Sequence, residues 1–432
     1  MVFTALWRRP LRAALVTGVA ASAATALASA VSSPADSNRG EGGHKRGDRA
    51  RNVIFLHGDG MGASARDLIR LATTGQDDDL VMNQLRYGGL VQTDPDDPEE
   101  PVTDSAAGAT AFASGVRTFN GAVGVDAQGR PVPTLLERAR AAGKSTGLVT
   151  TAQVTDASPA AFGAHVSDRA EQSEIARQFL EVSKPDVILG GGEDRWLPPD
   201  DPGAYPDNPP KDPTEESSSD RGDLIARAQQ LGYEYVSDRA GLQSSRARKL
   251  LGLFANEEMF EQRPEGEGDI YEPVVPLDEM TAKALGILKA DRKGFFLFVE
   301  EEGIDEFEHR NNTPKTILAG QSLDRAVAVA VRFAATHPGT LLVVAGDHAT
   351  GGLAIENVDE TDESGDDVSA EDGPFTVAGS DLQFVVDWTT GGHTGESTPL
   401  TAEGPGARAL ARVQKNTDVH DAILTAMRLR QG

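Results

Sequence analysis

The chain of 432 residues contains no cysteine, and this absence sets the first limits on its chemistry. It excludes a disulfide framework, a thiolate metal site and a cysteine nucleophile. Histidine is also scarce, with eight residues in the whole sequence. Any metal site must therefore combine these few imidazoles with the carboxylates of aspartate and glutamate.

Basic residues are outnumbered, since 41 lysines and arginines stand against 67 aspartates and glutamates and give a formal charge of −26. A field of this sign repels nucleic acids and anionic membrane surfaces, so we expect neither as a specific partner. The composition, 39% hydrophobic and 25% charged, is that of a globular protein. It excludes collagen, a coiled coil and a wholly disordered chain.

The first thirty residues have the pattern of a secretory signal peptide. Arg8, Arg9 and Arg12 precede a run of small apolar residues, and the Ala-Ser-Ala sequence at 28–30 fits a cleavage site. The run is short and rich in small polar residues, which disfavours a stable membrane span. We predict a signal peptide over residues 1–30 and an exported protein, secreted or periplasmic, with no membrane attachment after cleavage. The adjacent arginines leave a twin-arginine signal open beside an ordinary one.

Beyond this segment, the sequence is typical of an α/β protein. Residues 31–50 are polar and lack an apolar period, so we expect a disordered linker before one folded domain over residues 51–432. Apolar runs predict strands at 53–57, 146–150, 186–190, 295–299 and 341–345, and periodic stretches predict helices at 105–114, 133–142, 170–183, 278–290, 316–335 and 417–429. Strands that are apolar on both faces and separated by helices predict a three-layer sandwich, with a central, mostly parallel sheet flanked by helices on both faces.

Two stretches break this alternation. Residues 196–222 carry seven prolines among many acidic residues, which excludes regular core structure there, and residues 356–373 carry nine acidic residues. We expect both to be solvated surface loops, with a calcium site as the alternative for such acidic runs.

Acidic residues follow three of the predicted strands. Asp59 and Asp347 come shortly after apolar runs, and Glu300 directly follows FFLFV. Because ligands bind outside the carboxyl ends of parallel strands, we expect these acids to converge on one crevice. A single aspartate there would more often be a helix N-cap. Three carboxylates together would repel one another unless cations lay between them, so the sequence indicates a metal site.

Three histidines stand beside acids or glycines. Asp305 and His309 are four residues apart and share one face of a helical turn, while His348 follows Asp347 directly and His393 lies in GGHTGE. Zinc suits such a mixture of imidazole and carboxylate ligands. We place three further histidines outside the site, two at the surface and one at a helix end: His44, His420 and His337.

A candidate nucleophile lies in VTDSAAGATAFASG, residues 102–115. Asp104 and Ser105 precede small residues of good helix propensity, which places Ser105 at a helix N-terminus, where free N–H groups and the dipole favour an anion. The small residues at 106–111 would let this helix approach its neighbours closely. No GxSxG sequence surrounds Ser105 and the histidines serve the metal, so a metal-activated serine is favoured over a Ser-His-Asp triad. Alone, such a serine is usually an ordinary helix cap.

Six blocks of sequence resemble the successive motifs of the alkaline phosphatase family, in that family's order. They run from about residue 52 to residue 397 and read NVIFLHGDGMG, VTDSAAGATAFASG, TDASPAAFGAHVSDR, VEEEGIDEFEH, VVAGDHATGG and GGHTGE. Any one block is weak evidence, whereas six in order are highly specific. The resemblance implies that residues 51–432 form an alkaline phosphatase-like catalytic domain.

The resemblance also implies a role for each matching residue. Ser105 matches the serine that is transiently phosphorylated, and Arg169 matches the arginine that grips two phosphate oxygens. The residues that match ligands of one zinc ion are Asp305, His309 and His393, and those of the second are Asp59, Asp347 and His348. Magnesium would be held by Asp59, Ser158 and Glu300, with Asp156 in its water shell.

Two zinc ions and one magnesium ion would leave local positive charge that suits a phosphate dianion, despite the acidic surface. The implied function is a secreted alkaline phosphatase that hydrolyses small phosphate monoesters, and the resemblance suggests a homodimer. Two alternatives stay open. One is a phosphodiesterase of the same superfamily, which the two-oxygen grip of Arg169 disfavours, and the other is a non-catalytic metal-binding surface protein.

Two residues depart from the family pattern. Glu306 follows Asp305 where relatives often carry lysine or histidine, and His57 stands at a strand position that is usually apolar. An acid at position 306 would weaken phosphate binding or hold an extra cation.

Overall fold

The structure is a computed structural model that describes residues 49–205, 216–260, 271–358 and 370–430. The predicted signal peptide, residues 1–30, and almost all of the predicted linker lie outside the described residues. Among the helices that are described, none combines the length and the apolar character needed to cross a membrane.

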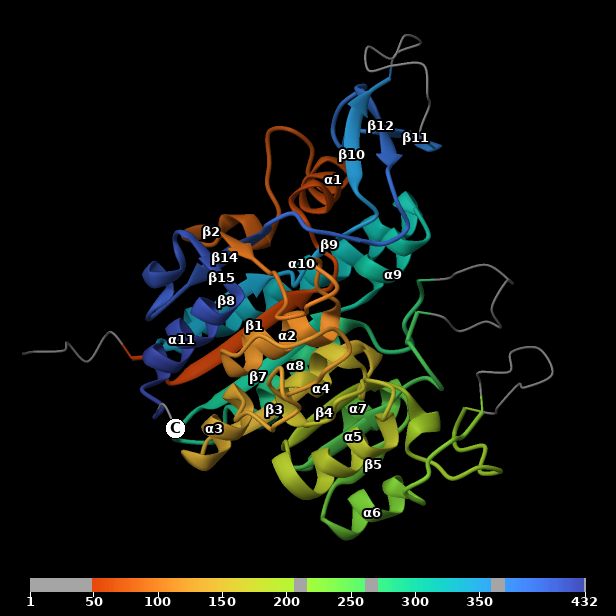
Figure 1. The fold of residues 1–432 in the computed structure, drawn as a ribbon, viewed down its shortest axis with the longest axis vertical. Coiled ribbons are helices and arrows are strands. Elements are labelled where there is room, and N and C mark those ends of the chain that lie inside the picture. Colours follow the sequence, from red (N-terminus) through yellow and green to blue (C-terminus); the bar gives the residue numbers. More distant parts are fainter. Residues whose placement is uncertain (1–48, 206–215, 261–270, 359–369, 431–432) are drawn as a thin grey trace, which may run out of the picture. The chain divides into compact units, whose positions relative to one another are not determined.

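A sheet of ten strands forms the centre of the fold (Figure 1), in the order β15-β2-β14-β8-β1-β7-β3-β4-β6-β5. Only β14 runs antiparallel to its neighbours β2 and β8, and the other pairs are parallel. The strands are β1 (Asn52–Gly58), β2 (Tyr87–Gln92), β3 (Ser145–Gln153), β4 (Val187–Gly191), β5 (Glu234–Val236), β6 (Leu250–Leu253), β7 (Phe295–Glu301), β8 (Thr340–Ala345), β14 (Thr398–Glu403) and β15 (Val413–Lys415). The predicted mostly parallel sheet is confirmed.

Alternate side chains of the central strand enter two separate hydrophobic cores. In β1, Val53 and Phe55 belong to one core, whereas Ile54 and Leu56 belong to the other. All four are fully buried, and each contributes about 1.5–3 kcal/mol to stability by leaving water. Because both faces are covered, the strand reads as a continuous apolar run and not as an alternating one.

Helices cover both faces and confirm the three-layer sandwich (Figure 1). Those that pack in the first core are α2 (Ser105–Ser114), α3 (Leu135–Ala141), α4 (Ala157–Gly163), α5 (Gln172–Gln178), α6 (Leu224–Gln230) and α11 (Asn416–Met427). Those that pack in the second are α1 (Ala63–Thr73), α7 (Arg239–Ser244), α8 (Leu277–Leu288), α9 (Gly303–His309) and α10 (Thr313–Thr336).

Two small antiparallel sheets follow β8. β10 (Leu353–Asn357), β12 (Gln383–Trp388) and β11 (Ala370–Thr376) form one, and a separate apolar cluster that includes Trp388 and Leu68 of α1 lies beneath it. The other pairs β9 (Ala349–Thr350) with β13 (His393–Thr394). Its register aligns His393 with Thr350, and so places a late histidine beside the end of β8.

Three sequence predictions need correction. The proline-rich stretch 196–222 begins in the core, where Trp196 is fully buried, and its residues 206–215 lie outside the described part. The acidic stretch 356–373 includes the end of β10 and the start of β11, with residues 359–369 outside the described part. His420 is buried on α11 because the amphipathic period of that helix turns it inward. His337 follows α10 as predicted, and His44 is not described.

One partly buried histidine that the sequence did not single out stabilises the start of α3. His165 places Nε2 3.0 Å from Glu137 Oε1 and Nδ1 2.6 Å from the carbonyl oxygen of Gly124. Glu137 also closes the capping box of α3, because its Oε2 accepts from the N–H of Thr134. Burial opposes both charges, yet the hydrogen bond between the two side chains raises the pKa of His165 and lowers that of Glu137.

Replacing His165 by glutamine should therefore destabilise the protein by about 1–2 kcal/mol at pH 6 and by less at pH 9. The raised pKa of His165 gives stability that is complete below about pH 6.5 and is lost as the pH rises through the folded-state pKa. The lowered pKa of Glu137 gives stability that is lost only in acid. Urea unfolding of the wild type and the variant at both pH values measures the difference. Equal losses at pH 6 and pH 9 would contradict a charged pair, and Glu137→Gln should show the same pH dependence.

Candidate active site

The candidate site lies at the carboxyl edge of the central sheet. Asp59 follows β1, Glu300 lies near the end of β7, and Asp347 follows β8. All three side chains are buried. Because β1 lies between β7 and β8, the three carboxylates that the sequence predicted to converge are brought together by neighbouring strands.

The first group of side chains surrounds the hydroxyl of Ser105, which is the first residue of α2. Its Oγ donates to Asp59 Oδ1 at 3.4 Å and lies 3.2 Å from His348 Nε2. The same imidazole nitrogen is 3.4 Å from Asp59 Oδ1 and 3.4 Å from Asp347 Oδ2. One ligand atom each from Asp59, Asp347 and His348 lies within 4.8 Å of the others, a spacing that one metal ion can span.

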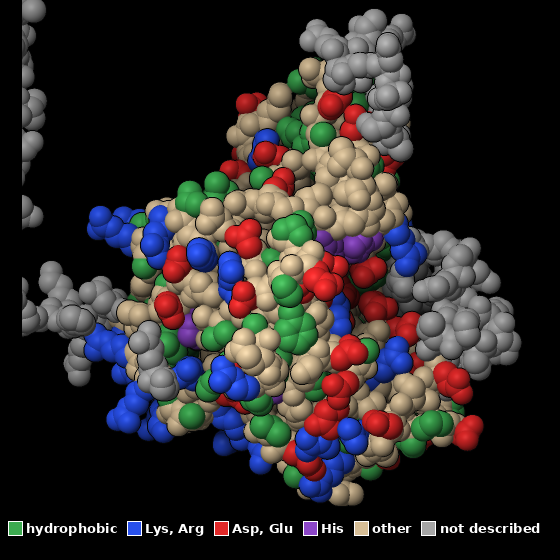
Figure 2. All heavy atoms as spheres, in the orientation of Figure 1, with side chains coloured by type: hydrophobic (Ala, Val, Ile, Leu, Met, Phe, Trp, Pro, Cys, Tyr) green, Lys and Arg blue, Asp and Glu red, His purple; other side chains and the backbone are tan. Residues whose placement is uncertain are grey.

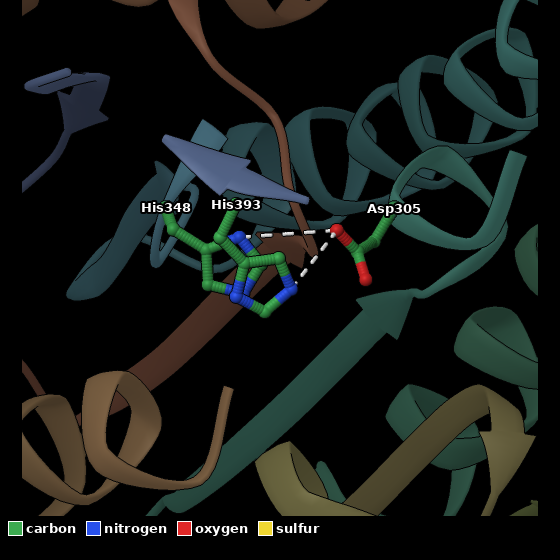
Figure 3. A group of neighbouring side chains, drawn as sticks. All are labelled: Asp305, His348 and His393. Carbon is green, nitrogen blue, oxygen red and sulfur yellow. Dashed lines mark ion pairs between the residues drawn. The ribbon is translucent and has the colours of Figure 1, made fainter. Parts of the chain in front are cut away.

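The second group is centred on Asp305 of α9. His348 Nδ1 and His393 Nε2 each lie 3.8 Å from Asp305 Oδ1, and Figure 3 shows both rings directed at this carboxylate. His309, one turn later on α9, places Nε2 3.0 Å from Asp305 Oδ2. His309 and His393 are the more open members, with side chains 32% and 18% exposed. In Figure 2, histidine side chains reach the surface next to a group of acidic side chains.

The hydrogen bonds of two imidazoles favour a cation between them. The Nδ1 atoms of His309 and His393 lie 2.7 Å from the carbonyl oxygen of Gly391 and 3.0 Å from that of Thr103, so each Nδ1 carries the proton. Their Nε2 atoms then face one another at 3.1 Å. Two lone pairs at this distance repel unless a proton or a metal ion lies between them, and a carbonyl partner on Nδ1 is typical of metal-ligating histidines.

The third group supplies oxygen atoms. Ser158, in the first turn of α4, donates to Asp59 Oδ2 at 3.2 Å, and Thr150 donates to Glu300 Oε2 at 2.6 Å. Glu300 Oε1 is buried and has no hydrogen-bond partner among the described residues. One nitrogen of His57 also lies within 4.8 Å of oxygens of Asp59 and Glu300. The oxygen atoms of Asp59, Ser158 and Glu300 thus form a third cluster that can hold an ion, with the His57 ring beside it.

The buried carboxylates of the site differ in the direction of their pKa shifts. Burial raises the pKa of Asp59 well above its usual value, with a further contribution from Asp347 and Asp305, and burial raises the pKa of Glu300 to about 7. Asp305 is equally buried, but hydrogen bonds from His309 and His393 hold its pKa well below the usual value. In return, the hydrogen bond to Asp305 raises the pKa of His309 to about 9. The site therefore carries more negative charge than its own side chains can neutralise.

Arg169 lies beside this cluster and is held by two carboxylates. Its Nη2 donates to both oxygens of Asp156, at 2.9 and 3.0 Å, and its Nη1 is 3.6 Å from Asp104 Oδ2. Asp104 is in turn fixed as the N-cap of α2, because it accepts from the backbone N–H of Ala107 and of Gly121, both at 2.9 Å. The guanidinium is thereby placed next to the helix start that carries Ser105.

Two glycines allow the close packing on which the site depends. A Cβ at Gly108 of α2 would lie 3.0 Å from the Cβ of Asp347, so this small residue lets the helix approach β8 as the sequence indicated. Gly60 has a φ of 67°, and a Cβ there would lie 2.6 Å from Asp305 Oδ1. Side chains at either position would push ligand carboxylates apart.

Every residue that the sequence assigned to the site lies in this region. Glu306 lies on α9 directly after Asp305, where its charge adds to the raised pKa of His309. Sequence reasoning missed the partners that orient the ligands, chiefly Thr150, Thr350 and the backbone carbonyl of Thr103. Thr350 donates to Asp305 Oδ1 and its Oγ1 is 3.2 Å from His348 Nδ1. No local signal marks such threonines, because their role arises only from the tertiary fold.

The comparisons with known proteins agree with one another. The family model for alkaline phosphatase matches residues 50–378. Alkaline phosphatase 4 of Bacillus subtilis is 30% identical, over 89% of this chain and 90% of that protein. Streptomycin-6-phosphate phosphatase of Streptomyces griseus is 34% identical, over 88% of this chain and 91% of that protein.

Solved structures give the same result. The alkaline phosphatase of the Antarctic bacterium TAB5 has a TM-score of 0.72 at 27% identity, and covers 89% of this chain and 100% of its own. That of Thermus thermophilus has a TM-score of 0.73 at 26% identity, and covers 89% of this chain and 93% of its own. The chain therefore belongs to the alkaline phosphatase family of metal-dependent phosphoric monoester hydrolases.

Proposed function

We propose that this chain is an exported alkaline phosphatase that cleaves small phosphate monoesters through a phosphoserine at Ser105, in a site with two zinc ions and one magnesium ion. The observation that carries the proposal is the placement of the Ser105 hydroxyl. It lies at the N-terminus of α2 and 3.2 Å from His348 Nε2, among carboxylates that need cations. Export rests on the N-terminal sequence, and a homodimer rests on the resemblance to the family.

The donor atoms present fit these ions. Asp305, His309 and His393 would hold one zinc ion, and Asp59, Asp347 and His348 the other, since mixed imidazole and carboxylate sets suit zinc. Asp59, Ser158 and Glu300 offer oxygen only, which suits magnesium. When bound, the ions would offset the buried carboxylates and stabilise negative charge on the serine and leaving-group oxygens.

A similar protein of known structure supports the assignment of magnesium to the third site. A variant of the TAB5 alkaline phosphatase in which a histidine is replaced by aspartate has magnesium bound in its M3 site, and it matches this chain at 28% identity with a TM-score of 0.71. This chain carries an aspartate, Asp156, where the family resemblance places a residue of the magnesium water shell. Asp156 also accepts from Arg169, so it would link the magnesium site to the phosphate-binding guanidinium.

Different residues of the chain would act in different steps of phosphate monoester hydrolysis. Ser105 Oγ loses its proton and attacks the phosphorus atom in line with the ester oxygen, the bond to that oxygen breaks, and the leaving oxygen takes up one proton, so that a neutral alcohol departs. Arg169, held by Asp104 and Asp156, donates N–H groups to two phosphate oxygens and fixes the angle of attack. The free N–H groups at the start of α2 favour the dianion. Water then attacks the phosphoserine from the vacated side, which releases phosphate and restores the Ser105 hydroxyl.

A monoester fits this arrangement better than a diester. A phosphate monoester dianion has three non-bridging oxygens that share two negative charges, whereas a diester has two that share one, so the guanidinium attracts the monoester more strongly. The relative from Streptomyces griseus is by name a phosphatase of streptomycin 6-phosphate, which is a small phosphate monoester. Family membership therefore supports a phosphomonoesterase over a phosphodiesterase and over a non-catalytic metal-binding protein.

Replacing Ser105 by alanine should lower kcat for an aryl phosphate by about a thousandfold or more, because the group that accepts the phosphoryl is removed. Removal of metal by a chelator should abolish hydrolysis, and zinc with magnesium should restore it. Ser114→Ala, at the other end of the same helix, is the matched control and should keep most of the activity. Full activity in Ser105→Ala, or in metal-free protein, would refute the proposed mechanism.

Replacing Arg169 by alanine should lower kcat/KM for p-nitrophenyl phosphate by about a hundredfold or more, because it removes two hydrogen bonds to charged oxygens and each is worth about 1.5–3 kcal/mol. Hydrolysis of bis-p-nitrophenyl phosphate should fall much less. Arg169→Lys keeps the positive charge but not the planar, two-pronged donor, so its kcat/KM for the monoester should lie between those of the wild type and Arg169→Ala. Parallel losses for both esters would show that Arg169 does not select monoesters.

A further inference from the structure

His57 is a polar residue inside the apolar run of β1, and it is fully buried. Its register places it opposite Glu300 of β7 and Ala345 of β8, close to the carboxyl edge where the candidate site lies. A buried imidazole is costly unless a polar partner compensates for the loss of water. Packing alone therefore does not explain why a histidine occupies this buried strand position.

Aromatic rings fix the imidazole of His57 on the core side. Its ring centroid is 5.6 Å from that of Phe298 in β7, 6.4 Å from that of Phe112 in α2 and 6.3 Å from that of Phe55 in β1. Phe112 belongs to the helix that begins with Ser105. The ring is thus wedged between the sheet and the helix of the candidate nucleophile, and its orientation is restricted from several sides.

The nearest polar partner of His57 is Asp347. His57 Nε2 is 3.3 Å from Asp347 Oδ1, although neither ring nitrogen makes a well-aligned hydrogen bond with the described residues. The other oxygen of the same carboxylate, Oδ2, is 3.4 Å from His348 Nε2. The backbone N–H of Gly60 also donates to Oδ1, at 3.4 Å. Asp347 therefore has one oxygen on the side of His57 and Gly60, and the other on the side of the group that contains Ser105.

We propose that His57 is a positioning residue of the metal centre. Its Nε2–H would restrain Asp347 Oδ1, which lies 3.3 Å away, so that Oδ2 stays directed at the ion that Asp59, Asp347 and His348 would share. Partners of this kind orient a metal-binding carboxylate, and their removal typically costs ten- to a hundredfold in metal affinity. The inference rests on the proposed function, because it assigns an ion to Asp347.

The site explains why a histidine suits this strand position. An apolar side chain at position 57 would fill the same space beside Phe298 and Phe112, but it could not donate to a carboxylate. Asp347 is packed closely against Gly108 of α2, because a Cβ at that glycine would lie 3.0 Å from the Cβ of Asp347. A donor to Oδ1 would add a polar restraint on the orientation of the carboxylate, which a ligand needs because it must meet an ion within a few tenths of an ångström.

The test measures metal binding directly. His57→Leu removes the donor at similar volume, and His57→Gln keeps an amide donor. We expect His57→Leu to weaken one zinc site by ten- to a hundredfold in chelator competition and to change the visible spectrum of the cobalt-substituted protein, while His57→Gln recovers part of the loss. Phe298→Leu is the packing control, since it alters the pocket of His57 but removes no donor, and should change affinity less than threefold.

Asp347→Asn separates the inference from the function on which it rests. If this variant binds zinc like the wild type, Asp347 is not a ligand and the proposed metal assignment fails. If Asp347→Asn loses an ion while His57→Leu keeps full affinity and an unchanged cobalt spectrum, the role of His57 is overturned. In the double variant, His57→Leu should add no further loss, because it acts through Asp347. A further, independent loss, or loss of the magnesium site alone, would show that His57 acts in another way.

Discussion

Repulsion among buried carboxylates is the constraint on which this structure depends. Asp59, Glu300, Asp305 and Asp347 are all nearly inaccessible to water and lie at one edge of the sheet. Burial in itself favours the neutral acid, yet only the ionised form binds cations. Hydrogen bonds from His309 and His393 keep Asp305 ionised, whereas burial raises the pKa values of Asp59 and Glu300. The strongest requirement for cations in this acidic protein therefore lies at the carboxyl edge of the sheet, where these carboxylates are buried.

The strands of the sheet could be predicted from the sequence where both of their faces are buried. β1, β3, β4, β7 and β8 were found from sequence because both faces are covered and the runs are almost continuously apolar. β2 and β14 were missed, since buried and more exposed residues alternate in them and β2 begins with two glycines among its first three residues. The short helices α4 and α9 gave no periodic signal, because tertiary contacts and not amphipathicity define them.

The candidate site was predictable to the extent that its residues follow strands. Asp59, Glu300 and Asp347 come directly from the rule that parallel strands present their carboxyl ends together. Arg169 and Ser158 have no such signal and were reached only through the resemblance to the family. Sequence marked His57 as unusual, but only the structure shows its distance to Asp347. Charged residues in loops are too common for their pairing to be read without coordinates.

The register of β1 has a consequence for the order of events during synthesis. Its two neighbours in the sheet, β7 and β8, lie more than two hundred residues later in the sequence, and His393 comes later still. No nascent chain can assemble these ligands until nearly all of it has left the ribosome. Pairings of such high sequence separation also form slowly. The chain is therefore unable to collect metal ions, or to act on any phosphate ester, while it is still being made.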